Sequence, residues 1–299
     1  MTVTSSMKKA IESMSAQSDD LTGDGYRQRR QWDSVAAGWE KWWRTIEDGA
    51  QSVSERMLGL AAVQPGHRVL DIATGIGEPA LRAASRVGPA GRVVATDISS
   101  RMLDFARARA TSLGLTNVEF REVDAERLDF PDRSFDVVLC RWGITSLPSP
   151  ANTMVAIRRM LAPGGSFATA VWEAGSRGRP LASLASAVAR EMFDSPSTPQ
   201  EDPAVPGSAG KALEEALVHA GFRHVHVEEM TLALGFPTAG HCIQYLMDVS
   251  PDLAALLSVR SSGEQAAFRR IVANRLGQFV TTDGSIRIPN VTNCAVGRR

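Results

Sequence analysis

Strand-like segments recur between residues 67 and 173, and this recurrence is the strongest constraint on the fold. Five short segments rich in apolar and β-branched residues lie at 67–73, 91–98, 118–125, 134–143 and 166–173, and helix-forming segments separate most of them. Strands buried on both faces read as continuous apolar runs, and such strands followed by helices form parallel sheets with right-handed crossovers. With two later strands at 223–234 and 287–299, the sequence predicts an α/β fold: a Rossmann-like, doubly wound, seven-stranded, mostly parallel sheet.

The segments outside this alternation predict a helical cap before the sheet and helical lid insertions late in the chain. Two helices are expected before the first strand, at 32–44 and 53–62, and the first would place Trp32, Trp39 and Trp43 near one face. The predicted organisation is a flexible segment 1–25, a cap 26–62, a cofactor-binding core 63–174, a lid insertion 175–210, continued core 211–237, a helical lid 238–285 and a terminal core strand 286–299.

Composition limits the kinds of partner that the protein can bind and the cellular compartment that it fits. The 33 basic and 33 acidic side chains give a net charge of zero, which argues against bulk attraction to nucleic acid or to an anionic membrane. The sequence has neither an apolar run long enough to span a membrane nor a signal-peptide pattern. The three cysteines are widely spaced, which fits reduced thiols in a cytoplasmic protein, and we expect no metal site. A monomer or a homodimer is compatible with these features.

The glycine-rich turn after the first strand is the motif that carries chemistry. Its letters, "VLDIATGIGEPAL", place Gly75, Gly77 and Ala80 in the G-x-G-x-x-G/A pattern of dinucleotide-binding proteins. Asp97, at the end of the next strand, lies at a suitable distance for a ribose. Taken alone, the turn is compatible with hydride transfer from a nicotinamide cofactor.

Carboxylates at the ends of three successive strands favour a different cofactor. Asp71 precedes the glycines, Asp97 ends the second strand and Asp124 ends the third. A pyrophosphate gains nothing from Asp71, whereas an ammonium group does. Asp97 suits ribose hydroxyls, and Asp124 with the Ala125 amide suits the edge of an adenine. S-adenosylmethionine has an ammonium, a ribose and an adenine but no phosphate, so the pattern predicts a methyltransferase.

The chain resembles the class I S-adenosylmethionine-dependent methyltransferases, and within them the ubiquinone/menaquinone methyltransferase-like branch with its secondary-metabolite relatives. The segments that carry the resemblance are "VLDIATGIGEPAL", "ATDIS", "FDVVLCRWGITSLPSPANTMVAIRRMLAPGG" and "IRIPNVTNCAVGRR". One departure is Ala73, which replaces the usual first glycine of the turn. The resemblance implies a cofactor site formed by Asp71, Ala73, Gly75, Gly77, Asp97, Ile98, Asp124, Ala125 and Arg141.

Residues for the acceptor and for proton transfer are less determined by the sequence. The candidates for catalysis are His241, Tyr26 and Arg141, and Arg141 could instead steer an anionic acceptor. Trp32, Trp39, Trp142 and Trp172 are the candidates for acceptor binding, although the cap tryptophans could equally hold their helix to the domain. An aromatic cap with few charges favours a flat, mostly apolar small molecule that is methylated on carbon, oxygen or nitrogen.

Two other functions stay open at this stage. The glycine turn allows an NAD(P)-dependent oxidoreductase, and a protein of this fold can bind S-adenosylmethionine without transferring its methyl group, because cofactor motifs report binding and not turnover.

Overall fold

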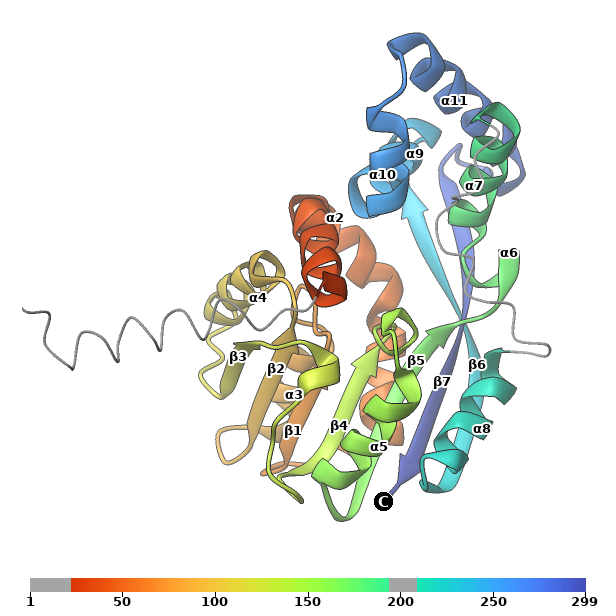
Figure 1. The fold of residues 1–299 in the computed structure, drawn as a ribbon. Coiled ribbons are helices and arrows are strands. Elements are labelled where there is room, and N and C mark those ends of the chain that lie inside the picture. The colour runs from red at the N-terminus through yellow and green to blue at the C-terminus, as the bar shows by residue number, and fades with distance from the viewer. Residues whose placement is uncertain (1–22, 194–208) are drawn as a thin grey trace, which may run out of the picture.

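In the computed structural model, which describes residues 23–193 and 209–299, seven strands form one sheet in the order β3-β2-β1-β4-β5-β7-β6 (Figure 1). β7 runs antiparallel between β5 and β6, and the other neighbours pair in parallel. The predicted seven-stranded, mostly parallel sheet is therefore confirmed. The strands are β1 (Arg68–Ile72), β2 (Arg92–Asp97), β3 (Val118–Glu122), β4 (Phe135–Arg141), β5 (Leu161–Trp172), β6 (Arg223–Phe236) and β7 (Ile286–Arg298).

Helices cover both faces of this sheet. The helices are α2 (Gly23–Leu60), α3 (Ala80–Val87), α4 (Ser100–Ser112), α5 (Pro150–Met160), α6 (Gly175–Gly178), α7 (Pro180–Phe193), α8 (Ala209–His219), α9 (Ala239–Val249), α10 (Pro251–Ser258) and α11 (Ser262–Arg275). Short 3-10 turns are η1 (Ala125–Arg127), η2 (Ile144–Ser146) and η3 (Leu276–Phe279). Ser99 caps α4 by accepting a hydrogen bond from the Met102 amide, as one of the two predicted serines should.

Alternate strand residues enter two apolar layers because successive side chains of a strand point to opposite faces. Val69 of β1 belongs to the layer that includes α2 and α3, and its neighbour Leu70 belongs to the layer that includes α5 and α8. Both side chains are fully buried. This burial on both faces explains why the strands read as apolar runs without alternation.

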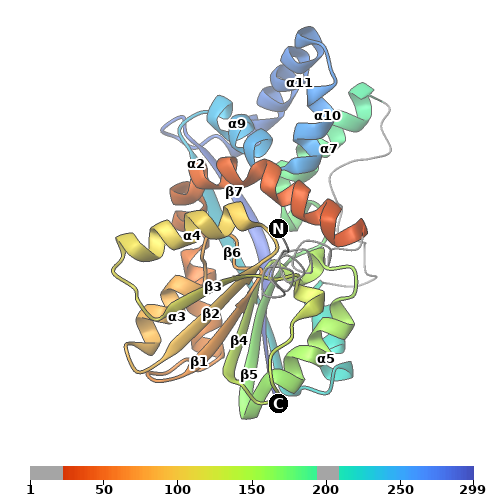
Figure 2. The same cartoon turned by 60° about the vertical axis from the view of Figure 1, so that its left-hand side comes forward.

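The cap differs from the prediction, because one continuous helix, α2, replaces the two expected helices. The glycines between and within the predicted segments do not end it. Instead they let other backbones come close: a Cβ on Gly49 would lie 2.8 Å from the Ala233 carbonyl oxygen of β6, and one on Gly38 would collide with the Asp248 carbonyl of α9. The first part of α2 crosses the carboxyl ends of the strands beside α4 (Figure 2).

Gly38→Ala should lower the free energy of unfolding, because the new methyl group overlaps the Asp248 backbone. Overpacking of this kind costs about 1–3 kcal/mol. Gly59→Ala on the same helix is the matched control: its Cβ would meet no atom within 4 Å, so it should gain up to about 1 kcal/mol from helix propensity. Urea unfolding of both variants measures the difference. Equal stability of the two variants would contradict the close approach of α2 and α9.

The late helices gather beyond the carboxyl ends of the strands. α7, α9, α10 and α11 lie together at the top of Figure 1, carried there by the long strands β6 and β7. Residues 194–208 of the predicted lid insertion, and 1–22 of the predicted flexible segment, lie outside the described residues. Residues 23–25 begin α2. The lid role of the late helices stays a prediction.

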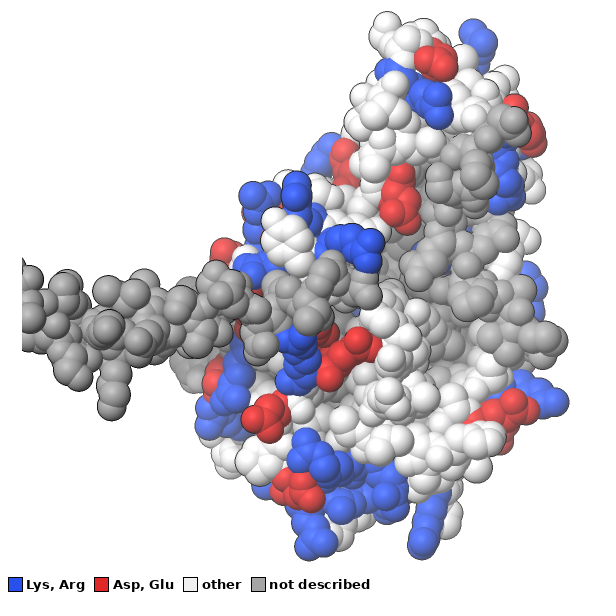
Figure 3. Space-filling view, in the orientation of Figure 1, with Lys and Arg blue, Asp and Glu red and all other residues white. Residues whose placement is uncertain are grey.

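Acidic and basic side chains are mixed over the face shown in Figure 3, with few charges over η2 and the upper part of α5. None of the helices that the structure describes combines the length and apolar character of a membrane span. The three cysteines are buried free thiols.

Candidate active site

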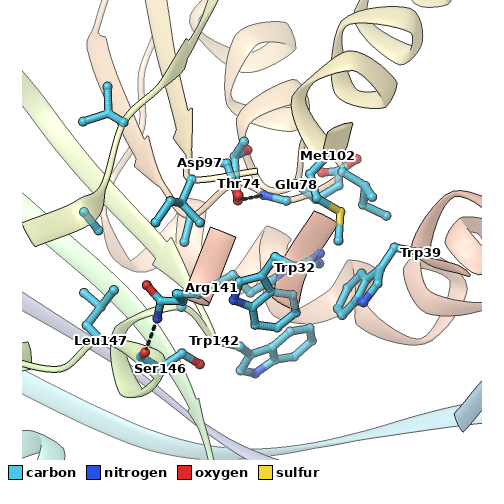
Figure 4. Close-up of a pocket in the computed structure, with 18 residues that line it drawn as sticks. Trp32, Trp39, Thr74, Glu78, Asp97, Met102, Arg141, Trp142, Ser146 and Leu147 are labelled. Carbon is cyan, nitrogen blue, oxygen red and sulfur yellow. Dashed lines mark hydrogen bonds between the residues drawn. The ribbon is translucent and has the colours of Figure 1, made fainter. Parts of the chain in front are cut away.

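Two adjoining cavities lie at the carboxyl ends of the strands, where the strand order reverses between β1 and β4, as ligand sites of such sheets do. The first cavity has a volume of about 850 Å³ with its solvent mouth included, and the second about 1560 Å³. Trp32, Trp39, Trp142 and Ser146 line both. The first cavity is bounded by α2, the glycine turn, the end of β2, η1 and the segment after β4 (Figure 4).

Backbone amides of the glycine turn before α3 donate hydrogen bonds to carboxylates of the protein itself. Gly75 and Gly77 have positive φ angles of 55° and 100°, which a side chain would strain. The Gly75 amide donates to Asp97 Oδ2 at 2.8 Å, and the Ala80 amide, at the start of α3, donates to Asp71 Oδ2 at 3.0 Å. The Gly77 amide donates to the Thr74 carbonyl at 3.0 Å. These amides are therefore not free to bind the phosphates of a dinucleotide.

Asp71 does not lie where the sequence placed it. It is fully buried and absent from the cavity wall, and besides the Ala80 amide it accepts a hydrogen bond from the Thr74 hydroxyl at 2.6 Å. Burial raises the pKa of Asp71 to about 7, against the lowering effect of the Thr74 bond. Its carboxylate lies at the N-terminus of α3. Asp71 therefore stabilises the glycine turn from beneath and does not contact a ligand in the cavity.

Asp97 does face the first cavity. It is 8% exposed, and its Oδ1 accepts the Ser99 amide at 2.9 Å while Oδ2 accepts the Gly75 amide. Burial raises the pKa of Asp97 to about 6, although its bonds to backbone amides lower it. Ala73, Gly75, Ile98 and Ala125 also line this cavity, as the sequence predicted, whereas Gly77 lies behind the wall.

Asp124 lies beside the cavity but outside its lining. Its carboxylate caps η1 by accepting the Glu126 amide at 2.9 Å, and its neighbours Val123 and Ala125 form the wall instead. The expected contact between Asp124 and an adenine edge therefore has no support from this geometry.

Glu78 is a wall residue that the sequence reasoning missed. It is 5% exposed; its Oε1 accepts Arg109 Nη2 at 2.9 Å, while Oε2 has no hydrogen-bond partner and only Arg82 Nε at 3.5 Å. Burial raises the pKa of Glu78, and the Glu47 carboxylate adds to this effect. An acidic residue directly after the last glycine of the turn was the signal available in the sequence.

Arg141 lines the first cavity, but its charge is already paired. Its guanidinium is 4% exposed and donates to Glu47 at 2.6 and 3.1 Å and to the Ser54 hydroxyl at 2.9 Å, both on α2. It also lies 4.8 Å from the centre of the Trp142 ring. This arrangement positions Trp142 and ties α2 to β4. It gives no support to a catalytic or steering role for Arg141.

The first cavity is consequently acidic. Glu78 and Asp97 line it, and Arg141, the one basic side chain among the described lining residues, is paired with Glu47. An acidic wall with a carboxylate oxygen lacking a hydrogen bond suits a ligand that carries a cation and hydroxyl groups, and it opposes a pyrophosphate.

The tryptophans separate the two cavities. Trp32 and Trp39 meet edge to face with ring centres 6.3 Å apart, and both pack against an apolar cluster that includes Ile76 of the glycine turn and Met102 of α4. Trp142 stacks on Trp172 with centres 4.1 Å apart, and Trp172 lines only the second cavity. The cap tryptophans thus both hold α2 and line the cavities.

His241 and Tyr26 line neither cavity. His241 is exposed, and its Nδ1 hydrogen-bonds the hydroxyl of Thr238, the residue that caps α9. Tyr26 is 51% exposed and contacts Arg30. A catalytic role for either therefore has no support from this geometry. Within residues 23–193 and 209–299, no group of three or more His, Cys, Asp and Glu side chains could hold a metal ion.

Comparison with known proteins identifies the family of the chain. A methyltransferase domain model matches residues 64–200. The ubiquinone/menaquinone biosynthesis C-methyltransferase UbiE of Ectopseudomonas oleovorans is 37% identical over 134 residues, which are 44% of this chain and 79% of that protein. The chain belongs to the class I S-adenosylmethionine-dependent methyltransferases. The UbiE protein of Ectopseudomonas mendocina is 39% identical over 150 residues, 50% of this chain and 58% of its own.

The chain spans little more than half the length of most of these methyltransferase relatives. Among solved structures, the [4+2]-cyclase SpnF has a TM-score of 0.53 at 20% identity, covering 84% of this chain and 81% of that one. At this identity the likeness concerns the fold alone. Because that name describes a reaction other than methyl transfer, membership of the fold does not by itself decide the reaction of this methyltransferase-family chain.

Proposed function

We propose that the protein transfers the methyl group of S-adenosylmethionine to a carbon atom of a mostly apolar, aromatic small molecule. The names of its C-methyltransferase relatives favour carbon over oxygen and nitrogen. The observation that carries the choice of cofactor is the glycine turn, where Asp71 and Asp97 accept the amides that a pyrophosphate would need. This arrangement argues against the NAD(P)-dependent alternative.

The lining of the first cavity fits the parts of S-adenosylmethionine. Asp97 has carboxylate lone pairs left for ribose hydroxyls, and Glu78 Oε2, which lacks a hydrogen bond, suits the ammonium group. Ile98, Val123 and Ala125 give an apolar wall for the adenine. The methionine end and the methyl group would then lie toward the tryptophans that separate the cavities.

When bound, S-adenosylmethionine supplies a sulfonium-activated methyl carbon: an electron pair of the acceptor forms the new bond, the carbon–sulfur bond breaks with its pair left on sulfur, and the acceptor releases one proton to water. The protein contributes alignment and exclusion of water. Trp32 and Trp39 would cover the site from α2, and Arg141 would hold Trp142 in place.

The test of methyl transfer is product formation. Purified protein is incubated with S-adenosylmethionine and a panel of quinols, phenols and indoles, and S-adenosylhomocysteine and methylated product are quantified by mass spectrometry. We expect both in equal amounts with at least one aromatic acceptor, and NMR of the product then distinguishes carbon from oxygen or nitrogen methylation. Tight cofactor binding without product from any acceptor would favour the alternative of a cofactor-binding protein without methyl transfer.

S-adenosylhomocysteine affinity should fall at acidic pH. The ribose contact needs the ionised carboxylate of Asp97, whose pKa is raised to about 6, so protonation below pH 6 removes an acceptor. A site with that pKa loses about tenfold in affinity between pH 7 and pH 5. The raised pKa of Glu78 acts in the same direction. Calorimetry at both pH values measures the change.

Asp71→Asn is the control for this pH dependence. Asp71 has a raised pKa but does not line the cavity, so the variant should keep the loss of affinity at pH 5. In the Asp97→Asn variant, most of this difference in affinity between pH 7 and pH 5 should disappear. A wild-type affinity that is the same at pH 5 and pH 7 would contradict the contact between Asp97 and the ligand.

A further inference from the structure

The second cavity lies between α2, the end of β5, α7, α9 and β7, and it joins the first cavity at the tryptophans. Its walls are mainly aliphatic and aromatic, with Leu181 of α7, Leu234 of β6 and Leu246 of α9 among them. At about 1560 Å³ with its mouth included, it has room for a ligand larger than a single ring.

A rigid aromatic surface forms one side of this cavity. The Trp142 and Trp172 rings are nearly parallel, at 13°, and Trp142 Nε1 donates to Thr292 Oγ1 at 2.9 Å. Trp142 is held at a φ of 62°, a conformation that is strained for a bulky residue and that clusters at functional sites. Because Trp142 covers one face of Trp172, a flat ligand can stack only on the opposite face.

Polar atoms without partners face the same cavity. Ser186 of α7 is 2% exposed, and its hydroxyl forms no hydrogen bond with any described residue. Asn290 of β7 is 4% exposed; its amide nitrogen donates to the Ile288 carbonyl, while its Oδ1 has no donor among the described residues. The Tyr245 hydroxyl of α9 likewise has no hydrogen-bond partner there. Because these atoms line the cavity and are not among the buried atoms that lack a partner, they are open to a ligand that enters it.

The charged side chains of this cavity are already engaged. Glu173 accepts the amides of Ala174 and Ala209 and the side-chain amide of Asn293. Asp252 accepts Gln31 Nε2 at 2.9 Å, and Arg179 also has a partner. Among the described residues of this cavity, the side-chain polar groups that lack a hydrogen-bond partner are neutral.

We propose that the second cavity is the acceptor site, and that it takes a neutral, flat molecule of more than one ring that stacks on Trp172 and hydrogen-bonds through a hydroxyl or carbonyl oxygen to Ser186 and Asn290. This proposal rests on the proposed methyl transfer, which places the methyl donor in the adjoining cavity. It separates this chain from proteins that methylate anionic acceptors, because a carboxylate would face the acidic side chains Glu173 and Asp252 here, while Arg179 already has a partner.

The test is calorimetric titration of the S-adenosylhomocysteine-saturated protein with 2-naphthol and, separately, with 2-naphthoate, which has the same rings but a charge. We expect 2-naphthol to bind at least tenfold more tightly than 2-naphthoate. Ser186→Ala should weaken 2-naphthol binding about three- to tenfold, as for one hydrogen bond, and Trp172→Leu about tenfold or more. S-adenosylhomocysteine affinity of Ser186→Ala, whose side chain lines only the second cavity, should stay unchanged, and retained S-adenosylhomocysteine binding shows that each variant is folded.

Ser85→Ala is the matched control. Its hydroxyl bonds the Leu81 carbonyl within α3, away from the second cavity, so 2-naphthol affinity should stay as in the parent. Equal or tighter binding of 2-naphthoate, or parent-like 2-naphthol binding by both cavity variants, would overturn the inference. If S-adenosylhomocysteine binds and 2-naphthol does not, the inference alone fails. If S-adenosylhomocysteine does not bind either, the proposed function fails and the inference falls with it.

Discussion

Asp97→Ala should weaken S-adenosylhomocysteine binding about 100-fold or more, since hydrogen bonds to a charged group are worth about 1.5–3 kcal/mol each and a ribose offers two hydroxyls. The substitution also leaves the Gly75 and Ser99 amides without their acceptor, which loosens the turn that forms the cavity wall. Isothermal titration calorimetry of both proteins at neutral pH measures the ratio of the two affinities.

The control for this variant is Asp104→Ala. Asp104 lies on α4, is largely exposed and pairs with Arg107, so its loss should leave the affinity unchanged. Circular dichroism shows whether each variant is folded. A folded Asp97→Ala protein that binds S-adenosylhomocysteine like the wild type would contradict the assignment of the first cavity.

Glu47→Ala should lower the free energy of unfolding by about 3–5 kcal/mol, because removing one partner of a buried ion pair leaves the other charge uncompensated. Glu47 and Arg141 are nearly inaccessible to solvent, with side-chain exposures of 6% and 4%, and their two hydrogen bonds join α2 to β4. The Ser54 hydroxyl would remain as a partner of Arg141, but it carries no charge. Urea unfolding monitored by tryptophan fluorescence measures the loss.

Glu191→Ala gives the matched comparison. Glu191 forms an ion pair with Arg275, but both side chains are substantially exposed, at 57% and 38%, so solvent screens the pair and its loss should change stability little. If Glu47→Ala costs no more than Glu191→Ala, the buried pair is not what fixes α2 over the cavities.

The central strands β1, β2, β4 and β5 could be read from the sequence because they are buried along most of their length and are mostly apolar, whereas β3 and β6 are partly exposed. The helical cap could not be read as well. Gly49 looks like a break, yet it lies inside α2, where its missing side chain makes room for the Ala233 carbonyl. The sequence does not distinguish a glycine that ends a helix from a glycine that allows another backbone to approach the helix closely. Only the tertiary packing shows which role the glycine has.

The same limit applies to the site. Asp71 and Asp97 both follow a buried strand, but Asp71 turns inward to the start of α3 while Asp97 reaches the cavity. Arg141 borders the cavity, yet its partner Glu47 is 94 residues away in the chain. Glu78 occupies an unspecified position of the G-x-G-x-x-G/A pattern, so the pattern indicates no role for it. Contacts between residues distant in the sequence decide which carboxylate faces a ligand, and no local pattern encodes them.

Calorimetric titration of the wild-type protein with S-adenosylhomocysteine and, in parallel, with NADH tests the central claim most directly. We expect S-adenosylhomocysteine to bind with a dissociation constant in the micromolar range, about −8 kcal/mol, and NADH to give no heat of binding. Because the Gly75 and Ala80 amides are bonded to Asp97 and Asp71, a pyrophosphate cannot use them as donors. Binding of NADH without binding of S-adenosylhomocysteine would contradict the claim and would show that the glycine turn binds a dinucleotide.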